Sequence, residues 1–459
     1  MEKLTFETIS EVTGGKLTGS KYDDGREVTA VVWDSRQVVA GCLFICIKGE
    51  KVDGHDFAMQ AVNDGAAGVL CERKIQGLNC PCIIVSSVLD ATQRLAAYYR
   101  KILGLTVVGV VGSVGKTSTK ELIASALRKK YRVNKTRGNY NNQWGVPFTI
   151  FGLKSTDEVA VIEMGISDFG EMDTLSRIAV PDIVVLTNIG QCHLEFLKSR
   201  DGILKAKSEV FNHMNPNGHV IINIDDDKLQ TISSVNGKKP EYYGFSKDAD
   251  ITAVNIKEKG LDGSEFDVIS RHGGGSMRFH IVLPMAGRHM IYNALAAIQV
   301  AMDLDVPALD IIECLKSSKV IEGRNNIIKL DRYTIIDDCY NASPSSMKSS
   351  IDLLQYAEGR RVAILGDMLE LGEKSEKFHF EIGKYVGNTD TELVICVGKI
   401  SEKMYLGARL AGEGHVEYFK TLEEAKKNIP GLLNEGDTIL IKASNGMHFK
   451  ELLEIIEKS

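Results

Sequence analysis

The sequence predicts an α/β protein with three domains. These are a small N-terminal α/β domain (residues 1–102), a central domain with a mostly parallel sheet covered by helices on both faces (103–320), and a C-terminal Rossmann-like domain (321–459). The chain has 459 residues, which is enough for about two to four domains. Alternating strands and helices begin near Leu105, and a second series of the same kind begins near Arg324.

The elements of each domain follow from short apolar runs and helical periodicity. In the first domain, strands are expected within 41–50, 65–72 and 81–88, and a helix over 90–103. In the second, strands are expected at 105–111, 158–165, 181–190 and 218–226, helices at 116–131 and 289–304, and antiparallel hairpins within 257–283. In the third, strands are expected at 333–339, 361–367, 392–398 and 437–444.

The composition excludes several classes of protein. Apolar residues make up 44% and charged residues 25%, as in ordinary globular proteins. The net charge of −6 and the absence of a basic run argue against a nucleic-acid partner. The nine cysteines show no zinc spacing, so we expect free thiols in a reducing compartment. No apolar run approaches about 18 residues and the first residues lack a signal pattern. We therefore expect a cytoplasmic protein without membrane insertion.

The segment GVVGSVGKTSTKE, residues 109–121, joins a strand to a helix through a phosphate-binding loop. Its pattern is G-x-x-G-K-[ST], shorter than the usual G-x-x-x-x-G-K-[ST], because Val110 stands where the first glycine would be. Backbone N–H groups of such a loop surround phosphate oxygens at the start of a helix. Lys116 would meet the outer phosphates and the Thr117 hydroxyl would hold Mg²⁺. The loop residues are Gly112, Ser113, Val114, Gly115, Lys116, Thr117 and Ser118. The alternative is an ordinary strand–helix turn with a surface lysine.

The shortened loop is the form found in Mur ligases and folylpolyglutamate synthases, and further segments resemble the Mur ligase family in the same order along the chain. They are 33–57, 139–149, 163–171, 187–196, 206–211, 287–297, 322–324, 337–354 and 366–379. The segments DDCYNASPSSMKSSIDLL and GDMLELGEKSEKFH resemble specifically the branch that adds D-alanyl-D-alanine. The chain is thus similar to this branch over nearly its whole length.

The resemblance implies an ATP-dependent ligase of peptidoglycan synthesis, and with it a role in cell-wall biogenesis, cell shape and cell division. It would join D-alanyl-D-alanine to the C-terminal carboxylate of UDP-N-acetylmuramoyl-tripeptide, through an acyl phosphate formed with ATP. The products would be the pentapeptide precursor, ADP and phosphate. Because several anions meet in such a site, positioning and electrostatic neutralisation supply most of the catalysis.

The resemblance also implies which residues take part. Lys116, Glu163, His193 and Lys207 would be catalytic, and Thr117, Glu163, His193 and Lys207 would hold Mg²⁺, as two ions by analogy with the family. The lysine that matches Lys207 is carbamylated in the family, which would make it an anion; a plain surface lysine is the alternative. ATP would also contact Asn142, His289, Asn293, Arg324, Asp338 and Asn341. The uridine nucleotide sugar would contact Ser35, Arg36, Lys48 and His55.

Three positions depart from the family pattern. Cys42 stands where an acid is common, Ser343 replaces an asparagine in N-A-N-P, and Asn445 follows K-x-S where an arginine is common.

The sequence alone leaves other functions open. They are a sibling ligase that adds a single amino acid, a polyglutamate-adding enzyme, and a nucleotide-driven switch or motor with the same loop.

Overall fold

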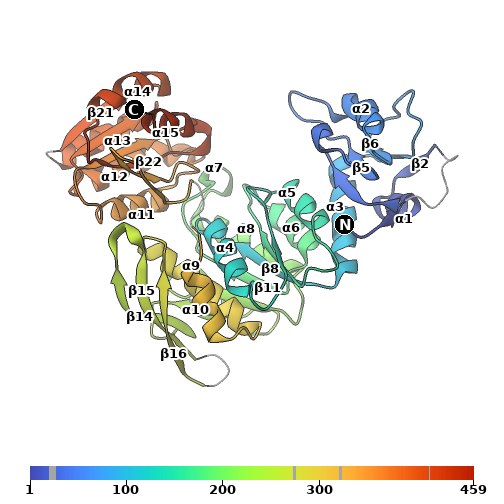
Figure 1. The fold of residues 1–459 in the computed structure, drawn as a ribbon, viewed down its shortest axis with the longest axis horizontal. Coiled ribbons are helices and arrows are strands. Elements are labelled where there is room, and N and C mark those ends of the chain that lie inside the picture. Colours follow the sequence, from blue (N-terminus) through green and yellow to red (C-terminus); the bar gives the residue numbers. More distant parts are fainter. Residues whose placement is uncertain (20–26, 272–274, 320–322, 413, 459) are drawn as a thin grey trace.

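The computed structural model describes residues 1–19, 27–271, 275–319, 323–412 and 414–458. Within these residues, three large sheets follow one another along the chain besides one two-stranded pair, and Figure 1 shows the first (blue) and the last (orange to red) on opposite sides of the central one. This confirms the predicted α/β class with three parts. The predicted boundary at 320–321 lies outside the described residues, so the exact domain bounds stay a prediction.

The first sheet has five strands in the order β2-β7-β6-β5-β4, and β4 to β7 are parallel. Its edge strand β2 is antiparallel to β7, and β1 and β3 form a separate pair. The elements of this part are β1 (Leu4–Thr5), α1 (Phe6–Thr13), β2 (Lys16–Thr18), β3 (Glu27–Val28), β4 (Ala30–Val32), β5 (Cys42–Ile45), α2 (Ala58–Asn63), β6 (Gly68–Cys71), β7 (Cys82–Ile84) and α3 (Val88–Leu103).

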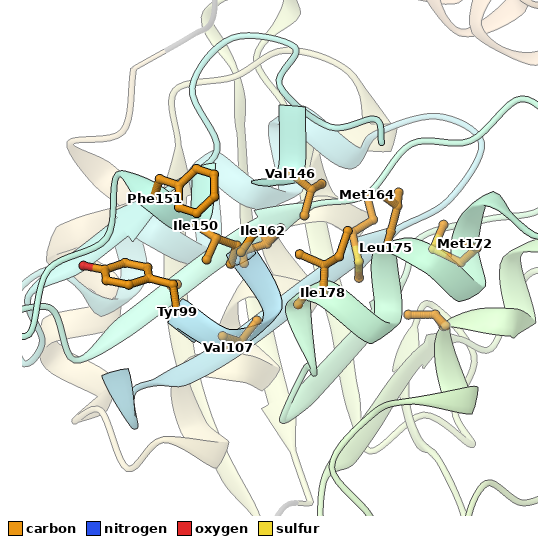
Figure 2. Close-up of a cluster of buried hydrophobic side chains, with 14 of the residues drawn as sticks. Tyr99, Val107, Val146, Ile150, Phe151, Ile162, Met164, Met172, Leu175 and Ile178 are labelled. Carbon is orange, nitrogen blue, oxygen red and sulfur yellow. The ribbon is translucent and has the colours of Figure 1, made fainter. Parts of the chain in front are cut away.

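Helix α3 attaches the first part to the central one. It begins at Ser87, whose side chain accepts from the N–H of Asp90, and ends at Gly104 in the left-handed conformation. Its inner face packs into an apolar core shared with the central part. Figure 2 shows the side chains of this core: Tyr99, Val107, Val146, Ile150, Phe151, Ile162, Met164, Met172, Leu175 and Ile178. The buried Arg100 adds an ion pair with Asp182, at 3.0 Å.

The central sheet has nine strands in the order β16-β15-β14-β13-β12-β11-β8-β10-β9. All neighbours from β14 to β9 are parallel, while β14, β15 and β16 form the predicted antiparallel hairpins. The elements are β8 (Thr106–Val111), α4 (Lys116–Leu127), β9 (Val133–Lys135), α5 (Gly145–Phe151), β10 (Val159–Glu163), α6 (Glu171–Ala179), β11 (Ile183–Leu186), α7 (Leu194–Leu197), α8 (Arg200–Ser208), β12 (His219–Asn223), β13 (Glu241–Gly244), β14 (Ile251–Glu258), β15 (Ser264–Ser270), β16 (Met277–Leu283), α9 (Arg288–Asp303) and α10 (Ala308–Lys316).

The third sheet has six strands in the order β17-β18-β22-β19-β20-β21, parallel except for the edge strand β17. The elements are β17 (Asn326–Lys329), β18 (Thr334–Asp337), α11 (Pro344–Leu354), β19 (Arg361–Gly366), α12 (Ser375–Gly387), β20 (Leu393–Val397), α13 (Ser401–Ala411), β21 (His415–Phe419), α14 (Leu422–Asn428), β22 (Thr438–Lys442) and α15 (Lys450–Ile456). Within the described part of the chain, every helix is too short or too polar to cross a bilayer.

Candidate active site

A cavity of about 610 Å³ lies where the carboxyl edge of the central sheet faces the third sheet. Most residues predicted from the sequence line it: Ser113, Val114, Gly115, Lys116, Thr117, Ser118, Asn142, Glu163, His193, His289, Asn293, Arg324, Asp338 and Asn341. Gly112 and Lys207 are buried behind this lining. The residues predicted for the nucleotide sugar belong to the first sheet instead.

The phosphate loop leads from β8 into α4. Gly115 precedes the helix with φ of +83°, a conformation that favours glycine, and no side chain of the described residues caps the helix N-terminus. The Lys116 ammonium group donates to the carbonyls of Gly112 and Ser113, at 2.9 and 3.2 Å. Burial lowers the pKa of Lys116. An uncapped helix start beside a cation forms a site for phosphate oxygens.

The end of β11 braces the loop from behind. The Thr187 hydroxyl and the Asn188 amide both donate to the Val114 carbonyl, at 2.7 and 3.0 Å. The Asn188 side-chain oxygen accepts from the Val114 N–H at 3.1 Å. A Cβ at Gly112 would lie 1.9 Å from the Thr187 hydroxyl oxygen, so only glycine fits there. The T-N-I-G segment therefore holds the loop in shape, a role that the sequence did not suggest.

Glu163, at the end of β10, offers a carboxylate oxygen to the cavity. Its Oε1 accepts from the Asn141 amide at 2.7 Å. Its buried Oε2 accepts no hydrogen bond from the described residues, although the Lys120 ammonium nitrogen lies 3.6 Å away. A buried carboxylate oxygen in this state is costly unless a cation binds it. The residues present therefore fit a divalent cation held by Glu163 and Thr117.

His193 lies just after β11, at the start of α7, and lines the cavity. Its Nδ1 lies 2.5 Å from Oε2 of Glu370, which belongs to the third domain. This contact lowers the pKa of the Glu370 carboxyl group. The sequence singled out the segment around Glu370 without giving it a role.

Lys207 is almost fully buried in α8, whereas its neighbour Lys205 is exposed and lies near the Phe169 ring. The two lysines thus lie on different faces of α8, and Lys207 is not the plain surface lysine of the alternative interpretation. Burial, together with the nearby Lys116 charge, lowers the pKa of Lys207 to about 7. A large fraction of this amine is therefore neutral at pH 7.

Residues predicted to bind ATP enter the cavity from two domains. Arg324 stacks on the Tyr340 ring at 3.9 Å, and its guanidinium lies 3.4 Å from the Thr117 hydroxyl. His289 on α9 pairs with the Asn325 amide at 2.8 Å, and burial lowers the pKa of His289. The third domain therefore already contacts the phosphate loop in this arrangement.

Two asparagines that line the same cavity, Asn293 and Asn142, are held by local contacts. The Asn293 side-chain oxygen accepts from the Thr119 hydroxyl at 3.1 Å, beside Gly115. Asn142 accepts from the N–H groups of Trp144 and Gly145, at 3.1 and 2.9 Å, and so shapes the start of α5. The predicted contacts of Asn142 and Asn293 with ATP stay predictions.

Asp338 forms a buried ion pair with Lys442, and the Ser350 hydroxyl also donates to it at 2.6 Å. The Lys442 ammonium group donates to the Asn341 carbonyl as well, at 2.9 Å. Lys442 thus joins β22 to the loop after β18. The predicted contacts of Asp338 and Asn341 with ATP stay predictions, and the sequence did not identify Lys442 as the partner of Asp338.

The four residues predicted for the nucleotide sugar lie at or near the carboxyl edge of the first sheet. Ser35 and Arg36 follow β4, and Lys48 follows β5. Arg36 pairs with Asp34 through two hydrogen bonds of 2.9 and 2.8 Å. His55 is buried; its Nδ1 bonds Asp53 at 2.6 Å, and its Nε2 accepts from the Glu72 N–H at 2.9 Å.

Both ring nitrogens of His55 are therefore engaged, and in this structure the residue supports the loop rather than offering a free edge. Its contact with the nucleotide sugar stays a prediction.

Among the departures from the family pattern, Cys42 is buried in the apolar core of the first part, and Asn445 lines the cavity.

Lys120 is the clearest residue that the sequence interpretation missed. Its side chain is buried and donates to the Thr136 carbonyl at 2.9 Å, while the Thr136 hydroxyl accepts from the Glu163 N–H at 3.0 Å. Its spacing of four from Lys116 places both on one helix face, which was the available signal.

Known proteins resemble this chain along its whole length. Three protein-family models match the chain. The family described as "Mur ligase family, catalytic domain" matches residues 27–116, the family "Mur ligase middle domain" matches 110–301, and the family "Mur ligase, glutamate ligase domain" matches 323–445. The UDP-N-acetylmuramoyl-tripeptide--D-alanyl-D-alanine ligase of Bacillus subtilis (strain 168) is 37% identical, over 100% of this chain and 99% of that protein. The chain belongs to the Mur ligase family.

Solved structures of the family have the same fold. A crystal structure of MurF from Acinetobacter baumannii is 29% identical with a TM-score of 0.91, and the match covers 100% of both chains. A MurF ligase from Thermotoga maritima, solved in complex with ADP, is 30% identical with a TM-score of 0.82, covering 94% of this chain and 97% of that one. The three-part architecture is thus that of the Mur ligases.

Proposed function

We propose that this protein is the ATP-dependent ligase that joins D-alanyl-D-alanine to the C-terminal carboxylate of UDP-N-acetylmuramoyl-tripeptide. The products are the pentapeptide precursor of peptidoglycan, ADP and phosphate. The observation that carries the proposal is that one cavity is lined by the phosphate loop, Glu163 and third-domain residues. The substrates are inferred from the full-length likeness to ligases named for this reaction.

The phosphate loop and α4 supply the ATP end of the site. N–H groups at the start of α4 and the Lys116 ammonium group receive the phosphates. Arg324 adds a planar cation from the third domain, beside Thr117. These groups reduce the repulsion between ATP and the substrate carboxylate, so that the γ-phosphoryl group can pass to a carboxylate oxygen. The amine of the dipeptide then attacks the acyl carbon, and phosphate leaves with that oxygen.

Thr117, Glu163, His193 and Lys207 would hold two Mg²⁺ ions. Bound Mg²⁺ would neutralise charge on the transferred phosphoryl group. Glu163 keeps an oxygen available for it, because Asn141 and Thr136 fix the other oxygen and the backbone. These contacts hold the carboxylate in one orientation before any ion binds.

Lys207 would act as a carbamate rather than as a cation. Its neutral amine adds to the carbon of CO₂ and releases one proton, which leaves a carbamate anion able to face Mg²⁺. Two observations support this role: the side chain is buried beside Lys116, and its pKa is lowered to about 7. An ordinary lysine is almost wholly protonated at neutral pH and reacts poorly with CO₂.

The first domain would hold the uridine nucleotide sugar at the carboxyl edge of its sheet, near Ser35, Arg36 and Lys48. We further propose that the protein works in the cytoplasm, where ATP and the precursor are present. Its product would serve cell-wall growth, and therefore cell shape and division.

A phosphate-release assay tests the function. The protein would be given ATP and Mg²⁺ with UDP-muramoyl-tripeptide alone, with D-alanyl-D-alanine alone, or with both. The proposal expects steady phosphate release only with both substrates. Turnover with single amino acids in place of the dipeptide would identify a sibling ligase. ATP hydrolysis that needs neither substrate would identify a switch or motor and overturn the proposal.

A further inference from the structure

The loop after β19, residues 367–372, is firmly anchored inside the third domain. The Asp367 carboxylate accepts from the N–H and the hydroxyl of Ser401, at 2.7 and 2.6 Å. The Met368 N–H donates to Nε2 of the buried His379 at 2.9 Å, and the Leu369 N–H donates to the Ser444 hydroxyl at 2.9 Å. These contacts attach the base of the loop to the third domain.

The far end of this loop reaches the central domain at α7. Figure 1 shows α7 beside the third domain. The Glu195 N–H donates to the Glu370 carbonyl at 3.3 Å, and a Cβ at Gly372 would lie 3.2 Å from Cα of Glu195. The Glu370 carboxylate lies 2.5 Å from Nδ1 of His193. The contact thus joins the two domains at the histidine that lines the cavity.

The backbone on both sides is shaped for this contact. Glu370 has φ of +61° and His193 has φ of +53°, in the left-handed region that residues with a side chain seldom adopt. Such conformations persist where the surrounding structure demands them, often at functional sites. Nδ1 of His193 is buried and lies 2.5 Å from the Glu370 carboxylate, in a contact whose angle falls short of a regular hydrogen bond, and among the described residues it has no other hydrogen-bond partner. The ring as a whole keeps 24% of its side-chain surface exposed and lines the cavity.

We propose that Glu370 is a positioning residue that holds His193 from the third domain. A carboxylate on Nδ1 keeps the proton on that nitrogen and leaves Nε2 with a lone pair for the cavity. His193 would therefore take its working orientation only when the third domain is docked. This inference rests on the proposed function, because it assigns His193 a role toward Mg²⁺.

The test compares E370A, E370Q and the control E373Q, which removes one charge from an exposed residue just after the loop. Two readouts are used. One is ¹⁵N NMR of histidine-labelled protein, which shows where each of the 10 histidines carries its proton; H193N assigns the His193 signals. The other is the Mg²⁺ concentration for half-maximal ligase activity.

E370A should shift the His193 signals and raise the required Mg²⁺ concentration about 10-fold or more. E370Q keeps a hydrogen-bond acceptor, so its His193 signals and its required Mg²⁺ concentration should lie between those of E370A and the wild type. Both quantities should be the same in E373Q as in the wild type. Unchanged His193 signals in E370A would overturn the proposal, even if activity fell, because the loop would then be only a structural tether. A shift of the His193 signals in E370A without any change in the required Mg²⁺ concentration would overturn the inferred role of the contact toward Mg²⁺. If the wild type showed no ligase activity while E370A still shifted the signals, the proposed function would fail and the Glu370–His193 contact would stand.

Discussion

Replacing Lys207 by methionine should remove a pH-dependent destabilisation of the central domain. The pKa of Lys207 is about 7 in the folded protein against an ordinary value of 10.5. Between these values the unfolded chain binds a proton that the folded chain does not. The free energy of unfolding therefore rises with pH across this window, by at most about 1.4 kcal/mol per pH unit. From pH 7 to pH 9 the rise from this one group is about 2 kcal/mol.

Methionine has a similar length and no charge, so K207M should lack this rise and should unfold at higher urea concentration than the wild type at pH 7. Urea unfolding would be followed by tryptophan fluorescence in bicarbonate-free buffer at pH 7 and pH 9. The two tryptophans report on the right region, because Trp144 precedes α5 and the Trp33 ring lies 6.2 Å from the Phe148 ring of α5.

K205M is the matched control, since Lys205 is exposed on the same helix. It should keep the wild-type pH dependence. The reasoning fails if K207M and the wild type respond equally to pH, or if K205M and K207M lose the response together.

Three further predictions concern other residues of the site. G112A should weaken ADP binding about 10-fold or more in calorimetry, because the added Cβ would lie 1.9 Å from the Thr187 hydroxyl oxygen. G275A, whose Cβ meets nothing within 4 Å, is the control, and near-normal binding by G112A would contradict the account. E163Q should reduce turnover at saturating Mg²⁺ about 100-fold, while its affinity for ADP in EDTA should stay within a few-fold of the wild-type value. Turnover of E163Q equal to that of the wild type would show that Glu163 does not hold the metal. D338N should destabilise the third domain by about 3 kcal/mol in urea, because Lys442 would lose its buried counter-charge. The double variant D338L/K442M should recover part of that loss, and an unchanged D338N midpoint would show that the ion pair contributes nothing.

The features that sequence predicted well depend on local pattern. The loop at Gly112–Thr117 lies between a strand and a helix as expected, because glycine conformation and helix start are set by adjacent residues. Glu163 and His193 line the same cavity because they follow parallel strands that end at one edge of the sheet, while their roles toward Mg²⁺ come from the family resemblance and stay predictions.

The features that sequence missed depend on contacts between distant segments. Lys442 meets Asp338 across 104 residues, and Glu370 meets His193 from another domain. The predicted contact of His55 with the nucleotide sugar stays a prediction, and the sequence did not indicate that Asp53 and the Glu72 N–H engage both of its ring nitrogens. A single sequence indicates which side chains could do chemistry, but not which neighbours occupy their polar atoms.

The origin of the oxygen in the released phosphate tests the central claim most directly. UDP-muramoyl-tripeptide labelled with ¹⁸O in its terminal carboxylate would be incubated with the protein, ATP, Mg²⁺ and D-alanyl-D-alanine. Phosphorylation of the carboxylate predicts that each phosphate released carries one ¹⁸O atom, seen by mass spectrometry. Phosphate free of label, formed together with the amide product, would contradict transfer of the phosphoryl group to that carboxylate.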